Sequence, residues 1–195
     1  VAAREEGWSS LKPIELIITS KSRLQQKYGT EGYERIERRL AELEEAISQE
    51  MGVRRVCVDD EGSLALYGLA PVDPTDPWAI KGLIDRLDEG LQKEGRRAKF
   101  ILLVGGEGII PFCPLPNPAE DEEPQILSDA PYGCRGDGYL LPDRAVGRLP
   151  DGGQEEFLIS LLEVAVQGHR EAAKATSSGL GTGILRRPQN HTSSF

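Results

Sequence analysis

The sequence predicts an α/β protein, a three-layer sandwich whose mainly parallel sheet lies between layers of helices. Three observations lead to this fold class. Short apolar runs alternate with segments of helical periodicity, and the connections between the runs are long enough to be whole helices, which favours right-handed crossovers and parallel strands. The run "KFILLVGG" at 99–106 is apolar without alternation, as expected of a strand that is buried on both faces. A chain of 195 residues is long enough for one such core.

The first half of the chain supplies two strands and the helix between them. "IELIITS" at 14–20 is a short, β-branched run that predicts a strand, and "VRRVCVDD" at 53–60 predicts a second one. Between them, apolar residues recur every three or four positions and so lie on one face of a helix, which we expect Gly52 to end. This stripe consists of Tyr33, Ile36, Leu40, Leu43, Ile47 and Met51.

A turn-rich passage at 59–76 leads to a second predicted helix. Asp76 is expected to cap its N-terminus and Pro77 to occupy its first position, where a missing N–H costs nothing. Gly95 is placed to stop the helix. The buried stripe of this helix is expected to be Ile80, Leu83, Ile84, Leu87 and Leu91.

The third predicted strand is followed by an excursion over 106–143 that is rich in proline, glycine and acids. Loops of this length in compact domains are usually functional or mobile. "RAVGRLP" at 144–150 then predicts a short strand that returns the chain to the sheet. Asp151 and Gln154 are spaced as a capping box for a further helix that runs to about Ala173. Its inner face is expected to be Phe157, Leu161, Val164 and Ala165.

Composition limits the partners and the surroundings of the chain. With 23 basic and 32 acidic side chains the formal charge is -9, which disfavours nucleic acids and anionic lipid surfaces. No apolar run approaches the roughly 20 residues that cross a bilayer. We therefore expect a soluble protein, with the cytoplasm favoured. Residues 1–175 are expected to form one α/β subdomain, and 176–195 an irregular tail or the start of a missing half.

The three cysteines do not form a recognisable catalytic or metal-binding pattern. Cys57 lies in a predicted strand, where a structural role is expected, whereas Cys113 and Cys134 lie in the excursion and are better placed for chemistry. A disulfide between these two stays open, although the odd count and the irregular spacing favour a reducing compartment. The candidate bases, His169 and His191, have no catalytic signature around them.

Two kinds of ligand site are weighed in the same region. "GGEG" at 105–108 is similar to a phosphate-binding turn, but Pro111 stands where the last glycine of that motif belongs and no helix follows, so a flavodoxin-like nucleotide-binding domain is the weaker interpretation. Asp129 and Asp137, with Asp143 and the acids at 121–123, could gather oxygen ligands for calcium. The alternative is that these acids accept hydrogen bonds from turn amides.

The segments "FILLVGGEGIIPF" (100–112) and "SDAPYGCRGDGYLLPDRAVGRLP" (128–150) carry a resemblance. In order and spacing they resemble the catalytic domain of gingipain-type cysteine peptidases, in the caspase-like clan. That family has a Leu-Val-Gly-Asp-like turn and Ile-Pro, then Ser-Asp-x-x-Tyr-Gly, Gly-Asp and Pro-Asp-x-x-Val-Gly-Arg-Leu. The chain departs from the pattern at Gly106-Glu107, where the family places its acid directly after the first glycine.

The resemblance implies that about half of a caspase-like catalytic domain is present. The family's His-Gly and Cys close two later strands, and neither is found here after Leu149, so no catalytic residue is assigned to this chain and the segment alone is expected to be inactive. Ser128, Asp129, Tyr132 and Gly133 would order the loop, and the strand of 143–149 would return it to the sheet. The structural loop residues implied by the motif are Ser128, Asp129, Tyr132, Gly133, Asp137, Asp143, Gly147 and Arg148.

The implied function is part of a caspase-like cysteine endopeptidase that cleaves proteins or peptides after a basic residue. Its partners would be the substrate and the remaining catalytic half, or a second processed chain. No cofactor is required, and calcium at Asp129 and Asp137 is the one metal considered. The alternative is a non-catalytic caspase-like scaffold that binds a partner protein through the excursion at 106–143.

Overall fold

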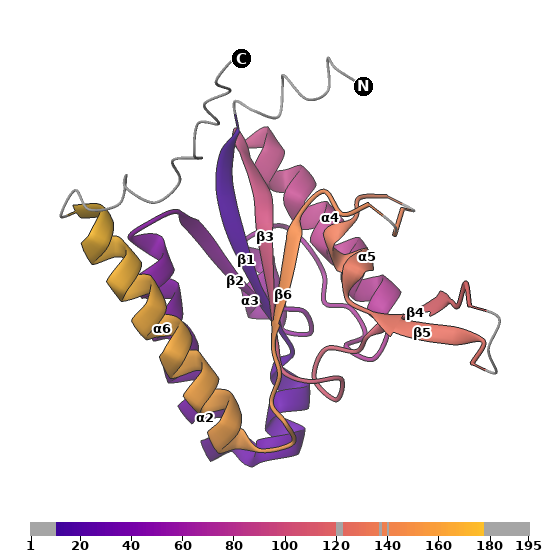
Figure 1. Ribbon diagram of the computed structural model, residues 1–195, viewed down its shortest axis with the longest axis horizontal. Helices are drawn as coiled ribbons and strands as arrows, with labels where there is room; N and C mark the ends of the chain where they lie inside the picture. The colour runs from indigo at the N-terminus through magenta and orange to yellow at the C-terminus, as the bar shows by residue number, and fades with distance from the viewer. Residues whose placement is uncertain (1–10, 120–122, 137, 140, 178–195) are drawn as a thin grey trace, which may run out of the picture.

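The structure, a computed structural model, describes residues 11–119, 123–136, 138–139 and 141–177. Its centre is a four-stranded parallel sheet in the order β2-β1-β3-β6 (Figure 1). The fold class predicted from the sequence is thereby confirmed. The four strands are β1 (Lys12–Thr19), β2 (Gly52–Cys57), β3 (Arg96–Val104) and β6 (Ala145–Leu149).

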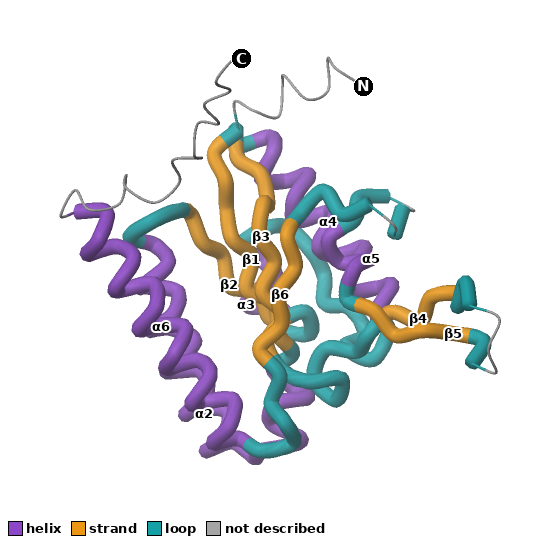
Figure 2. The backbone as a smooth tube through the Cα atoms, in the orientation of Figure 1, coloured by secondary structure: helices purple, strands orange, loops and turns teal. Residues whose placement is uncertain are grey.

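Helices cover both faces of this sheet. Figure 2 shows α2 (Lys21–Ser48) and α6 (Glu155–Ser177) side by side on one face and α4 (Pro77–Lys93) on the other. The connection from β1 to β2 therefore uses one face, and the connection from β2 to β3 uses the other. This alternation produces the three layers.

The core lies around β1, which, like β3, has a neighbouring strand on each side. Leu16, Ile17 and Ile18 are consecutive and fully buried, so side chains that point to opposite faces are both covered. At the end of β1 the Thr19 hydroxyl donates to the carbonyl oxygen of Val104 at 3.0 Å. This bond ties the ends of β1 and β3 together at the carboxyl edge of the sheet.

The first predicted helix begins earlier than its apolar stripe indicates. α2 starts at Lys21, where the Ser20 hydroxyl accepts the backbone N–H of Arg23, and it is interrupted at Gly29, whose φ of 70° is not helical. Without a Cβ, glycine adopts this conformation at no steric cost. Gly52, expected to end the helix, is instead the first residue of β2.

The excursion contains regular structure that periodicity did not predict. β4 (Cys113–Pro116) and β5 (Gln125–Ser128) pair as an antiparallel hairpin, which Figure 1 shows projecting from the body of the molecule. A single turn of helix follows, α5 (Ala130–Gly133). The turn-rich passage before α4 likewise holds a short helix, α3 (Glu61–Ala65). Elements of four or five residues are too short to show a period.

The caps of α4 agree with the prediction. The Asp76 side chain accepts the N–H groups of Trp78 and Ala79 at 2.9 and 3.2 Å, and Pro77 is the first helical residue. Gly95 follows the end of the helix with a φ of 73°. Here the local chemistry of the capping residues was enough to place both ends.

Two predictions for α6 are wrong. Asp151 does not cap the helix, because the helix begins at Glu155 and the Asp151 carboxylate bonds to other partners. The expected inner face is also wrong at two of its four positions, since Phe157 is 44% and Val164 is 70% exposed, whereas Leu161 is half-buried and Ala165 packs against the core. The buried residues are Leu158, Leu162 and Val166.

Candidate functional site

The carboxyl edge of the sheet is the place where the excursion leaves and returns. It leaves through Gly105, whose N–H donates to the carbonyl of Leu149 at 2.9 Å. Gly105 has a φ of 111°, and a Cβ there would lie 2.4 Å from the Cβ of Ile109, so only glycine fits. The N–H groups of Ile109 and Ile110 both donate to the carbonyl of Gly106. The "GGEG" turn therefore folds back on itself and does not open onto a helix N-terminus.

Arg148 joins the excursion to the strand ends. Its Nε and Nη2 donate to the two oxygens of Asp129 at 2.8 and 2.5 Å. Its Nη1 donates to the carbonyls of Gly105 and Ile110, both at 2.8 Å. The guanidinium carbon lies 4.4 Å from the centre of the Phe112 ring, and the side chain is 9% exposed. One planar group thus holds three chain segments through charge-assisted bonds and stacking.

Tyr132 and Gly133 position the single turn α5 against the same loop. The Tyr132 side chain is fully buried, and its hydroxyl donates to the carbonyl of Pro111 at 2.6 Å. The carbonyl of Gly133 accepts the N–H groups of Asp143 and Arg144 at 3.0 and 3.1 Å. A Cβ at Gly133 would lie 2.7 Å from the Arg144 carbonyl oxygen, so a side chain there would push the returning strand away.

The remaining motif residues close the turns at either end of α5. The Ser128 hydroxyl accepts the N–H of Ala130 at 3.1 Å, and the Asp143 carboxylate accepts the N–H of Arg135 at 3.0 Å. Gly147 pairs with Leu102 inside the sheet. Asp137 lies outside the described residues. The motif residues that the structure describes thus all lie in the excursion or in β6, and most of them hold the excursion in place.

A buried charge cluster, Lys81–Asp85–Asp88–Arg135–Arg144, fastens the excursion to α4. Arg144 is 1% exposed and donates to Asp85 at 2.9 Å and to Asp88 at 3.1 Å. Asp88 also accepts the N–H of Ala98 at 2.6 Å and pairs with Arg135 at 2.5 Å. Lys81 pairs with Asp85 and donates to the carbonyl of Gly136.

Sequence reasoning missed this cluster. The one available signal was the spacing of Lys81, Asp85 and Asp88, which places three charges on one side of a helix otherwise described by its apolar stripe. Their partners, Arg135 and Arg144, lie about fifty positions away along the chain and could not be paired with them by spacing.

The N-terminus of α2 is occupied by a carboxylate of the chain itself. Asp59 accepts the N–H groups of Lys21 and Ser22, both at 2.9 Å, and the hydroxyls of Ser20 and Ser22. Burial alone would raise the pKa of Asp59, but these hydrogen bonds outweigh it and lower the pKa. In open α/β folds this position after the first strand is where phosphates bind. Its occupation by Asp59 argues against nucleotide binding.

Asp151 forms a second acidic centre on the same edge. Its carboxylate accepts hydrogen bonds from Lys27 and Tyr28, each at 2.7 Å, and from the N–H of Gly153 at 3.2 Å. Burial opposes ionisation, but the bonds from Lys27 and Tyr28 lower the pKa of Asp151 overall. A Cβ on Gly106 would lie 2.6 Å from this carboxylate, so Gly106 gives it room.

The three cysteines are free thiols and all are buried. The disulfide left open between Cys113 and Cys134 is not present. Burial raises the pKa of Cys57 to about 12 and that of Cys113 to about 11, and it also raises the pKa of Cys134. A thiol must ionise to act as a nucleophile, so none of the three is prepared for attack at neutral pH.

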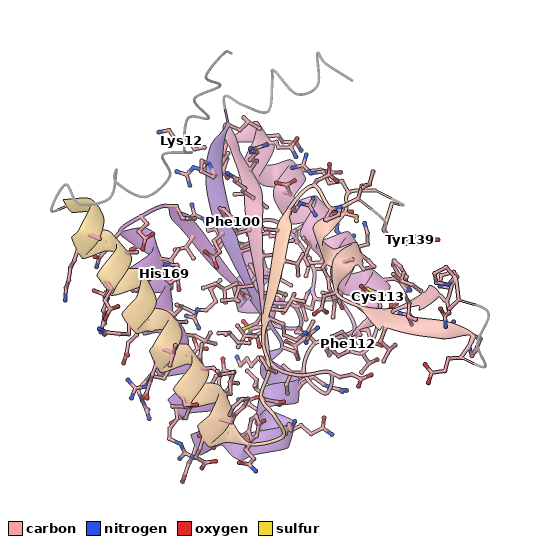
Figure 3. All side chains as sticks on the ribbon, viewed as in Figure 1. Lys12, Phe100, Phe112, Cys113, Tyr139 and His169 are labelled. Atoms are coloured by element: carbon pink, nitrogen blue, oxygen red, sulfur yellow. The ribbon has the colours of Figure 1, made fainter. Side chains whose placement is uncertain are left out.

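The candidate base His169 lies away from these thiols. It is on α6, with Nδ1 3.3 Å from Glu50 Oε1, and Figure 3 shows it on the opposite side of the sheet's strands from Cys113. It lines a hollow of about 390 Å³ together with Phe100 and Gly147. His191 lies outside the described residues. Within the part of the chain that the structure describes, no Cys–His pair is brought together.

Calcium binding stays a prediction. Both oxygens of Asp129 already accept bonds from Arg148, and Asp137 is outside the described residues. Among the residues that the structure describes, no group of three or more His, Cys, Asp or Glu side chains could hold a metal ion.

Comparisons with known proteins add little to this geometry. No protein-family model matches the sequence, and no curated protein matches it significantly. The chain is similar to a solved structure named "Structure of Protease", with 15% identity and a TM-score of 0.49 over 77% of this chain. It spans 26% of that structure's chain. A likeness at this level carries no argument about function. None of the helices in the described ranges is long and apolar enough to cross a membrane.

Proposed function

We propose that this chain is the N-terminal part of the catalytic domain of a caspase-like, gingipain-type cysteine endopeptidase that cleaves after a basic residue. Its His base and Cys nucleophile would lie outside residues 1–195. The observation that carries the proposal is the set of hydrogen bonds that the Arg148 guanidinium donates to the Asp129 carboxylate and to the carbonyls of Gly105 and Ile110. We call this set the Arg148 fork. It joins the motif segments on which the resemblance rests, 100–112 and 128–150, at one point.

The position of this fork supports a peptidase. In open parallel α/β sheets, ligands and catalytic groups gather beyond the carboxyl ends of the strands. The excursion leaves from that edge, and hydrogen bonds from Tyr132 and Arg148 hold it there. A loop held this firmly can form one wall of a cleft. Its residues would act by positioning, because none of them is a nucleophile.

The burial and raised pKa values of the three thiols support a catalytic Cys–His pair that lies outside residues 1–195. Cys57, Cys113 and Cys134 are buried with raised pKa values, and His169 bonds to Glu50. If the protein is a cysteine peptidase, its reactive thiol must therefore come from a continuing or associated chain.

The test is covalent labelling of the native gene product. A biotinylated peptidyl acyloxymethyl ketone that ends in arginine is incubated with the purified native protein, and the modified peptide is found by mass spectrometry. We expect labelling of one cysteine outside residues 1–195, and none with a matched probe that ends in aspartate. Labelling at Cys57, Cys113 or Cys134, or no labelling of intact protein, would contradict the proposal.

One observation favours the alternative, a non-catalytic scaffold that binds a partner protein. The hairpin of β4 and β5 exposes Ile126 by 40% and Leu127 by 58%, which is unusual for two adjacent apolar residues on a projecting element. For a scaffold, the arginine probe leaves the native protein unlabelled, while Leu127→Ser abolishes co-purification of a partner that the unchanged protein retains.

A further inference from the structure

The two edges of the β4–β5 hairpin differ in what they offer to a further strand. In an antiparallel pair, residues that bond to each other alternate with residues whose N–H and C=O groups point away from the partner strand. Pro114 and Pro116 have no N–H, so they belong to the second kind. The outer edge of β4 therefore lacks both of the donors that a third strand would need.

The outer edge of β5 keeps all of its hydrogen-bonding groups. Gln125 and Leu127 lie opposite the two prolines, so they also point their N–H and C=O groups away from β4. The bond from the N–H of Asn117 to the carbonyl of Pro124, at 3.2 Å, continues the same alternation. In the described ranges, the backbone groups of Gln125 and Leu127 form no hydrogen bond. Two donor–acceptor pairs, two residues apart, are the pattern that an extended strand binds.

The side chains of β5 are also largely uncovered. Gln125 is exposed, and Ile126 and Leu127 are 40% and 58% exposed on opposite faces of the strand. A hairpin of two strands is marginally stable in water, and a third strand stabilises it. Natural edges are usually protected by lysine, proline or a bulge; β4 has its prolines, whereas β5 has none of these. The free edge of β5 is therefore open to pairing.

We propose that the free edge of β5 binds an extended, basic segment of a partner polypeptide as a third strand of the hairpin. Main-chain hydrogen bonds to Gln125 and Leu127 hold the segment, and apolar side chains on it cover Ile126 and Leu127.

The charge of the hairpin determines the chemistry of this partner. Residues 113–128 contain four acids and no lysine or arginine, so basic side chains on the bound segment are attracted to the hairpin. A second copy of β5 would bring the same four acids with it, and like charges oppose that pairing. The inference rests on the pairing and the charge of the hairpin and does not depend on the proposed peptidase function.

The first experiment measures amide hydrogen exchange in the 195-residue chain by NMR, with and without a short peptide in which valine alternates with lysine. In the free protein the N–H groups of Gln125 and Leu127 are expected to exchange faster than that of Ile126, which is bonded to β4. At saturating peptide we expect exchange at Gln125 and Leu127 to slow by about tenfold or more. The matched control is the same peptide with glutamate in place of lysine, which is expected to give no protection.

Three results of this experiment would overturn the proposal. The first is unchanged exchange at Gln125 and Leu127 with the lysine peptide, and the second is equal slowing by both peptides. The third is slow exchange at these two residues in the free protein. Protection that persists on dilution would mean that another segment of the chain covers the edge, and protection that rises with concentration would mean that a second copy does.

The second experiment separates the backbone edge from the apolar side chains. Leu127→Pro removes the outward N–H without removing a bond to β4, whereas Leu127→Ala removes the side chain and keeps the N–H. Fluorescence anisotropy of the labelled valine–lysine peptide is expected to show binding about tenfold weaker for Leu127→Pro, and a smaller loss for Leu127→Ala. Gln125→Pro and Gln125→Ala repeat the comparison at the other outward position, in case one proline disturbs the hairpin. Equal losses within both pairs would mean that the backbone edge does not bind the peptide, and would overturn the proposal.

Discussion

The excursion and α6 each follow directly on a strand of the same sheet, yet different forces hold them. The excursion is fixed to α4 and to β6 by ion pairs whose arginines, Arg144 and Arg148, are 1% and 9% exposed. Helix α6 is fixed by apolar packing and by ion pairs such as Arg39–Glu163, in which the two side chains are 37% and 50% exposed. Exposed pairs of this kind contribute only about 0–1 kcal/mol each.

This difference explains why the position of the excursion is more tightly specified than the position of α6. A buried charge must meet its partner, because leaving it unpaired costs several kcal/mol, so the excursion has one acceptable position. An apolar side chain needs close contact with its neighbours but no particular charged partner. On α6 such contacts bury Leu158, Leu162 and Val166, whereas Phe157 and Val164 stay exposed.

The largest effect is expected where a buried charge loses its partner. Asp88→Asn keeps the shape of the side chain but leaves Arg144 and Arg135 with less compensation, at a cost of about 3–5 kcal/mol in the free energy of unfolding. Chemical denaturation followed by circular dichroism measures this. The matched control is Glu89→Gln, an exposed neighbour with the same change of charge. Equal stability of the two variants would show that the excursion is not held by this cluster.

The next effect separates the buried from the exposed apolar residues of α6. Leu158→Ala removes a fully buried side chain and is expected to cost about 2–5 kcal/mol. Phe157→Ala, one position away and 44% exposed, is expected to cost less than about 1 kcal/mol. Thermal unfolding of the two variants, side by side with the unchanged protein, gives the comparison. A larger loss for Phe157 would reverse the assignment of the inner face.

A smaller effect is expected at the fork of the excursion. Arg148→Lys keeps the charge but cannot reach both oxygens of Asp129 and two carbonyls at once, so we expect a loss of about 1.5–3 kcal/mol. Limited proteolysis should then cut within residues 106–143 sooner than in the unchanged protein. Arg170→Lys, on the exposed side of α6, serves as the control. Proteolysis of the Arg148 variant at the unchanged rate would mean that contacts within the hairpin and α5, without Arg148, are enough to keep the excursion folded.

The smallest effect concerns pH and the carboxylate at the N-terminus of α2. Because hydrogen bonds lower the pKa of Asp59 in the folded protein, its contribution is fully present above the unfolded carboxyl value, about 3.9. That contribution is lost as pH falls through the lower folded pKa. Asp59→Asn should lower the free energy of unfolding by about 1 kcal/mol at neutral pH, as the loss of a helix cap does. The variant should also lose less stability than the unchanged protein when the free energy of unfolding is measured at decreasing, acidic pH. The same dependence of unfolding free energy on acidic pH in the variant and the unchanged protein would contradict this account.

Much of the fold was predictable because its signals are local. Asp76 with Pro77 placed the start of α4, and the apolar run of β3 placed a strand inside the sheet. The expectation that this run is buried on both faces holds only in part, because Ile101 and Leu103 are buried whereas Phe100 and Leu102, on the other face, are half-buried. The hairpin and α5 were not predicted because elements of four residues show no period. The motif residues were found through a resemblance, while the partners that Arg148 holds became visible only in three dimensions.

Two predictions for α6 failed because a local pattern does not show which distant residues will be in contact. Phe157 and Val164 were expected to be inside because they follow a helical period, but Leu158, Leu162 and Val166 follow one too. A pattern of apolar residues shows that a helix has an inner face, and when the apolar arc is wide it does not show which part of the arc is covered. Asp151 was expected to cap α6, whereas Lys27 and Tyr28, more than a hundred positions away, compete for its carboxylate.

The sequence by itself determined the parallel sheet, its helical cover and the chain segments that lie at its carboxyl edge. These follow from apolar periodicity and from capping residues, which act over a few positions. Only the tertiary structure decided which charges are buried together, that Asp59 occupies the N-terminus of α2, and which apolar residues of α6 face out. Such contacts join residues distant in sequence, and the energy of a buried charge depends on a partner that spacing along the chain cannot reveal.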